Sequence, residues 1–67
     1  MRKISLNEQI DEVVRELAQR STVYPRLVQT GKMRESIADY QVERMTAVLN
    51  TLRWLRDNED KVRAAVQ

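Results

Sequence analysis

Few side chains in this 67-residue sequence could take part in covalent or acid–base chemistry. The chain has no Cys, so its nucleophiles are hydroxyl and amine groups such as Ser5, Ser21, Ser36 and Lys32. It also has no His, the side chain that most often serves as general base or metal ligand. Neither a glycine-rich phosphate loop nor a metal-ligand spacing occurs. We therefore expect a protein that is not an enzyme and that uses no metal and no cofactor.

The residues better suited to molecular recognition are Tyr40, Arg44 and Trp54. Tyr, Trp and Arg are enriched at the energetic centres of protein interfaces. At their spacing of four and ten residues, a helix would carry all three on one side. We predict that they form a strip that binds a partner protein, with Arg26 and Arg34 as charges at its rim.

A second candidate surface is basic. From Arg20 through Arg34 the sequence has no acidic residue, and it carries four cations there: Arg20, Arg26, Lys32 and Arg34. The net charge of +2 is too small to indicate a polyanionic partner by itself. This segment is either a solvated loop or a small site for an anion or an acidic protein. Nucleic-acid binding is the alternative function that it leaves open.

The elements that position these residues are predicted to be helical, in a single all-α domain spanning residues 1–67. Ser5 and Glu8 have the spacing of a capping box, and Gly31 is suited to the residue after a helix end. We expect a first helix over about residues 6–30, continuing with a kink through Pro25. Its apolar seam has heptad spacing and consists of Ile10, Val14, Leu17, Ser21, Tyr24 and Val28.

A second helix is expected over about residues 33–57, with a matching seam at Ala38, Gln41, Met45, Val48, Leu52 and Leu55. Paired positions such as Ile10 with Leu55, or Val28 with Ala38, keep a nearly constant sum. That is the condition for an antiparallel helical hairpin. Residues 58–67 form either a short last helix or a continuation of the second one.

Apolar residues remain beyond this seam, among them Leu6, Val13 and Leu27 on one flank and Leu49 on the other. A chain this short buries little surface alone, and exposed apolar rows usually mark an interface. We predict a homodimeric four-helix bundle whose register stays open. The core or dimer residues are Leu6, Val13, Val14, Leu17, Leu27, Val48, Leu49 and Leu52.

The location follows from what the sequence lacks. No run of about 18 apolar residues occurs, so we expect no transmembrane span and no membrane partner. Met1-Arg2-Lys3-Ile4 is not followed by the apolar segment of a signal peptide. We therefore expect a cytoplasmic protein.

Residues 8–55 resemble a group of short bacteriophage and prophage helical-hairpin proteins. The likeness lies chiefly in Tyr24-Pro25-Arg26 before the loop residue Gly31, followed by a second amphipathic helix. Loosely, the chain is similar to small phage proteins that take over the host. The resemblance implies a protein of the bacterial host cytoplasm that binds a host protein to inhibit or modulate it. The alternatives are a Rop-like nucleic-acid-binding hairpin regulator and a structural piece of a phage assembly.

Overall fold

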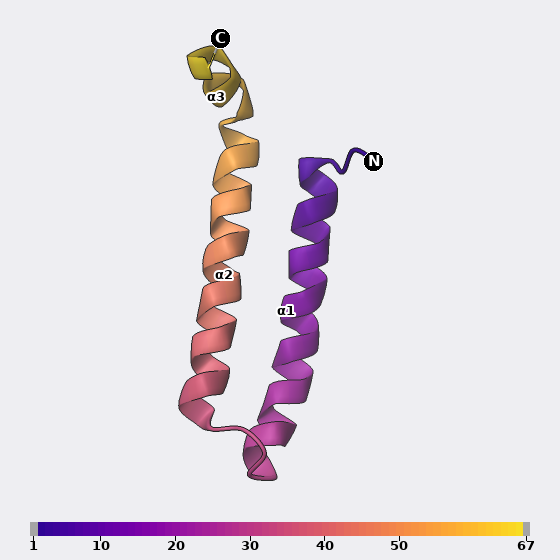
Figure 1. The fold of residues 1–67 in the computed structure, drawn as a ribbon, viewed down its shortest axis with the longest axis vertical. Helices are drawn as coiled ribbons and strands as arrows, with labels where there is room; N and C mark the ends of the chain where they lie inside the picture. Colours follow the sequence, from indigo (N-terminus) through magenta and orange to yellow (C-terminus); the bar gives the residue numbers. More distant parts are fainter. Residues whose placement is uncertain (1, 67) are drawn as a thin grey trace.

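The computed structural model describes residues 2–66, which form three helices and no strand. Helix α1 spans Leu6–Gln29, α2 spans Glu35–Asp57 and α3 spans Glu59–Val66. The two long helices lie side by side and antiparallel, while α3 continues beyond the start of α1 (Figure 1). The predictions of an all-α chain and of a hairpin built from two long helices are confirmed.

The start of α1 is fixed by a complete capping box. The Ser5 hydroxyl accepts a hydrogen bond from the Glu8 backbone N–H at 3.1 Å, and Glu8 Oε1 accepts one from the Ser5 N–H at 3.1 Å. Two backbone donors that have no partner within the helix are thereby satisfied. Hydrogen bonds with Ser5 lower the pKa of the Glu8 carboxyl. The bond with the Ser5 backbone amide has the larger effect, and the bond with the Ser5 side chain has the smaller one.

A single helix continues through Pro25, as predicted. Proline has no N–H to donate to the carbonyl four residues earlier, which here belongs to Ser21. Just before this gap, the Ser21 hydroxyl donates to the Leu17 carbonyl at 2.9 Å and the Thr22 hydroxyl to the Ala18 carbonyl at 3.2 Å. Hydroxyl groups thus add bonds to the backbone of the turn where the proline removes one.

The turn after α1 is a Schellman motif centred on Gly31. Its φ of 76° lies in the left-handed region that only glycine enters without steric cost. The Lys32 N–H donates to the Leu27 carbonyl at 2.8 Å, and the Gly31 N–H donates to the Val28 carbonyl at 3.1 Å. The chain therefore reverses within a few residues, and α2 begins at Glu35.

The core between α1 and α2 is thin. Only Ile10, Ala38 and Leu49 are buried among the apolar residues that the structure describes. Half-buried residues complete the contact, and they are Leu6, Val13, Leu17, Tyr24, Leu27 and Val28 on α1 with Gln41, Val42, Met45, Leu52 and Leu55 on α2. This leaves a hairpin with one narrow internal seam.

The predicted seam is wrong at three positions. Val14 and Val48 were expected to face the other helix but are 42% and 47% exposed. Their neighbours Val13 and Leu49 face inward instead. Ser21 is exposed too, and Arg20 takes its place. Each correction moves the contact by one residue, or about 100° around the helix. The heptad pattern allowed either phase because adjacent apolar residues stand at 13 and 14 and at 48 and 49.

Helix α3 is the short last helix that was one of the two alternatives for the C-terminal segment. The Asn58 backbone N–H ends α2 by donating to the Trp54 carbonyl at 3.0 Å, and the Asn58 side-chain amide donates to the same oxygen at 2.8 Å. Within the described part of the chain, α3 packs only against α2. It contributes little to the core of the hairpin.

Candidate interaction surfaces

The exposed side of α2 carries a stripe in which apolar residues predominate. We define the outer stripe as the six residues at alternating spacings of three and four that run along this side, namely Ile37, Tyr40, Arg44, Ala47, Thr51 and Trp54. Ile37 is 46% exposed, Tyr40 55% and Trp54 59%. The stripe is about 26 Å long at the helical rise of 1.5 Å per residue. Helix α2 therefore has a heptad seam facing α1 and a second one facing outward.

Two members of the predicted docking strip are in contact. The Arg44 guanidinium carbon lies 5.4 Å from the centre of the Tyr40 ring, within the range of a cation–π interaction. Tyr40 precedes Arg44 by one turn, so the Arg44 side chain extends toward the N-terminus of α2. Trp54 lies on the same stripe, about 15 Å farther along the helix axis. The structure thus places Tyr40, Arg44 and Trp54 on one continuous surface.

Arg20 has a role that the sequence did not predict. Its Nε donates to Glu16 Oε1 at 3.0 Å, and its Nη1 donates to the Gln41 backbone carbonyl of α2 at 3.4 Å. The guanidinium also lies 5.9 Å from the centre of the Tyr24 ring, and only 19% of the side chain is exposed. Arg20 therefore joins the two helices. The spacing of four residues between Glu16 and Arg20 indicates that these two side chains can form an ion pair. The bond from Arg20 to α2 could not be inferred in this way, because it depends on how the two helices pack.

Three cations remain at the tip of the hairpin. Arg26, Lys32 and Arg34 are exposed, and none of them takes part in an ion pair between residues 2 and 66. Arg34 precedes Ile37 by one turn and so lies at the end of the outer stripe. Arg26 lies sixteen residues after the buried Ile10, which places it about 160° away around α1. The structure therefore brings Arg34, but not Arg26, to the rim of the stripe.

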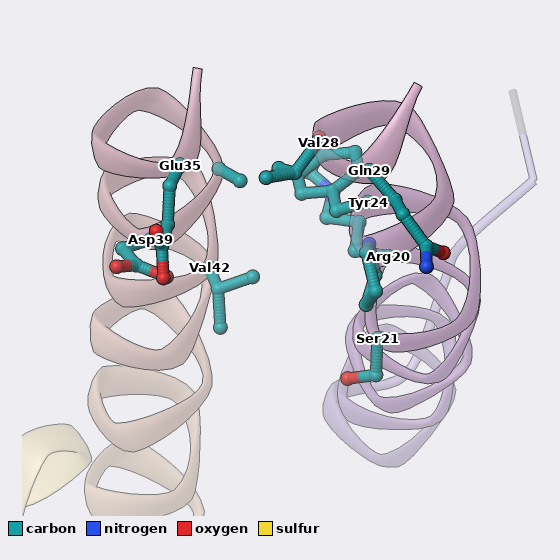
Figure 2. A pocket seen from close by; sticks show the side chains of 10 residues that line it. Arg20, Ser21, Tyr24, Val28, Gln29, Glu35, Asp39 and Val42 are labelled. Atoms are coloured by element: carbon teal, nitrogen blue, oxygen red, sulfur yellow. The ribbon is translucent and has the colours of Figure 1, made fainter. Parts of the chain in front are cut away.

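An open groove lies between α1 and α2 near the tip (Figure 2). It measures about 460 Å³ and has mainly apolar walls. Val28 and Val42 extend into the space between the helices, whereas Glu35 and Asp39 line the α2 side. The remaining residues that line it are Arg20, Ser21, Tyr24, Pro25, Gln29 and Ala38. This groove is on a different side of α2 from the outer stripe.

Between residues 2 and 66, no group of three or more His, Cys, Asp and Glu side chains is placed to hold a metal ion. No helix in this part of the chain combines the length and the apolar character needed to cross a membrane. Among the described residues, exposed apolar or unpaired cationic side chains gather at the outer stripe, the groove and the basic tip.

Comparisons with protein-family models, with curated proteins and with solved structures found no match to this chain.

Proposed function

We propose that this chain is a small phage-derived interaction protein that forms a homodimer and binds a host protein to inhibit or modulate it. The dimer would be the four-helix bundle expected from the sequence. The bacterial cytoplasm is the compartment in which it would act. The resemblance around Tyr24-Pro25-Arg26 and Gly31 supports the phage context, and the surface of the hairpin supports the dimer.

The observation that carries the proposal is the large accessible surface. The chain exposes 5781 Å². A compact monomer of 7.9 kDa is expected to expose about 4,400 Å² by the usual scaling with mass. The excess of about 1,400 Å² exceeds the ~800 Å² that each partner buries in a standard protein interface. A second copy would cover an area of this size and would supply the core that one hairpin lacks.

The test of the dimer is sedimentation equilibrium combined with circular dichroism. We expect a helical species with twice the monomer mass of 7.9 kDa at micromolar concentration. Dilution should reduce the mass and the helix content together, because a thin hairpin gains its stability from the partner. A helical monomer that unfolds cooperatively at these concentrations would contradict the dimer.

The test of the host partner is affinity capture from a bacterial lysate, using the wild-type chain and two double variants. R26S/R34S removes exposed cations of the tip, and the control R15S/R53S removes two exposed cations elsewhere. We expect the wild type and the control to retain one stoichiometric host protein and the tip variant to retain less of it. Recovery of no stoichiometric protein by the wild type would count against this function.

Nucleic-acid binding is the second candidate, favoured by the absence of ion pairs at Arg26, Lys32 and Arg34 among the described residues. Glu35 and Asp39 lie close to the same tip and reduce its positive potential. If this function holds, RNA or DNA should shift in a native gel at low salt, and the affinity should fall steeply as salt is raised. The variant R26E/R34E should abolish the shift. A shift that survives both changes would exclude the tip as the site.

A further inference from the structure

We infer that the outer stripe of α2 is the homodimer interface and that the two α2 helices cross it antiparallel. This inference rests on the proposed dimer and deepens it, because it names the occupant of the stripe and the direction of pairing. Since the stripe faces away from α1, the two α2 helices would lie at the centre of the dimer with one α1 on each outer side, in place of a bundle in which all four helices share one core. The predicted docking residues Tyr40, Arg44 and Trp54 then contact a second copy of the chain.

The distribution of exposed apolar side chains selects this surface. Four large apolar residues are exposed on α2, and three of them, Ile37, Tyr40 and Trp54, belong to the stripe, with Val48 beside it. On α1 the exposed ones are Val14 and Val23. These two are nine residues apart, which places them on opposite sides of α1. Among the described helices, α2 is the one on which exposed large apolar side chains recur along a single side, over about 26 Å.

Antiparallel pairing makes the stripe complementary to itself. With a two-fold axis near Met45 and Thr46, Ile37 lies opposite the partner's Trp54, Tyr40 opposite the partner's Thr51, and Arg44 opposite the partner's Ala47. Each pair occurs twice, as a two-fold interface requires. The small Ala47 side chain leaves space at the centre for the aliphatic part of the partner's Arg44.

The direction of Arg44 decides against the parallel arrangement. Arg44 extends toward the N-terminus of its own helix, over Tyr40. In an antiparallel pair, the two guanidinium groups therefore point in opposite directions and separate. In a parallel pair they would point the same way from facing positions, and two like charges would be buried side by side. At the flank, where facing residues are offset by two positions from the pairs above, the antiparallel pair brings Glu43 next to the partner's Asn50 and so places no like charges together.

This assignment leaves other surfaces for a different partner. The basic tip and the groove lined by Glu35 and Asp39 lie away from the central part of the stripe. A dimer would present each of them twice.

The direction of pairing can be measured with spin labels, because the chain has no Cys of its own. We would label the single-Cys variants S36C and N50C, both at exposed positions beside the stripe. Antiparallel pairing predicts axial separations between the two labels of about 28 Å for S36C and about 14 Å for N50C. Two short and similar distances would mean a parallel dimer and would overturn the inference.

The surface itself is tested by charge substitutions. We expect W54E to raise the dimer dissociation constant about 30-fold or more, as loss of a large aromatic residue from an interface does. The control V23E places the same charge on exposed α1 and should change the constant less than about 3-fold. A wild-type dimer that W54E leaves intact would overturn the inference but not the proposed dimer, even if W54E lost a host protein. A monomeric wild type would overturn both. If W54E does not fold, the distances between the spin labels test the inference instead, because the labelled variants keep all six residues of the stripe.

Discussion

The two long helices have nearly the same length, 24 residues in α1 and 23 in α2, but they differ in their caps and in how many of their sides are apolar. Helix α1 begins with a complete capping box and has one apolar side, which faces α2. Helix α2 has Arg34 at its cap position without a side-chain cap, and it has two apolar sides, one of which has no partner among the residues that the structure describes.

This difference indicates how each helix is stabilised. Helix formation is weakly favourable on its own, and most helical stability in proteins comes from packing. Helix α1 has local help at its start, whereas α2 depends on what covers its two stripes. A second copy should therefore stabilise α2 more than α1.

The largest effect on the free energy of unfolding should come from truncating the buried side of α2, compared with its exposed side. L49A removes a buried side chain of the inner seam and should lower the free energy of unfolding by about 2–5 kcal/mol. V48A alters the neighbouring residue, which is 47% exposed, and should cost about 1 kcal/mol or less. Urea unfolding at one fixed protein concentration measures both. Equal costs would contradict the inward position of Leu49.

The second-largest effect on the free energy of unfolding is expected at Pro25. Helix α1 contains this proline, whereas α2 contains none. P25A supplies an N–H that can donate to the Ser21 carbonyl and should raise the free energy of unfolding by about 1–3 kcal/mol. The change would bring α1 closer to a regular helix such as α2. Thermal unfolding at fixed concentration provides the measurement, and a lower melting temperature would show that Pro25 stabilises its turn.

A smaller effect separates the two helix starts. S5A removes a capping box and should cost about 1 kcal/mol, while R34S supplies α2 with a missing cap and should gain a similar amount. S36A, in the first turn of α2 but not at its cap position, is the control and should be nearly neutral. Matching losses from S5A and S36A would remove the distinction between the two starts.

The smallest effect is on pH dependence at the start of α1. Because hydrogen bonds from Ser5 lower the pKa of Glu8 in the folded chain, its contribution is complete above the unfolded-state pKa of the carboxyl. It is lost as the pH falls through the lower, folded-state pKa. NMR titration of the first-turn amides should show this fraying in acid, and E8Q should flatten it. An unchanged profile in E8Q would assign the fraying to other carboxylates.

The sequence predicted the parts of the fold that depend on local chemistry. The capping box of Ser5 with Glu8 and the turn at Gly31 follow from the properties of those residues, and both are confirmed. The continuation of α1 through Pro25 was predicted from the apolar spacing on either side of it, and it is confirmed as well. The phase of the seam was not predictable, since the neighbours of Val14 and Val48 are apolar as well. In the candidate site, the exposure of Tyr40 and Trp54 agrees with the predicted strip. The bond from Arg20 to the Gln41 carbonyl depended on residues brought together only by folding.

The Schellman turn at Gly31 has a consequence for the order in which the chain folds. It closes the hairpin through carbonyls only a few residues away, so the first contacts between α1 and α2 require the closure of a very short loop. Pairing should then spread from the tip toward Ser5, where partners are farthest apart in sequence. The open end, where α3 extends past α1, forms last and opens first. We expect amide hydrogen exchange to be fastest there and proteases to cut there first.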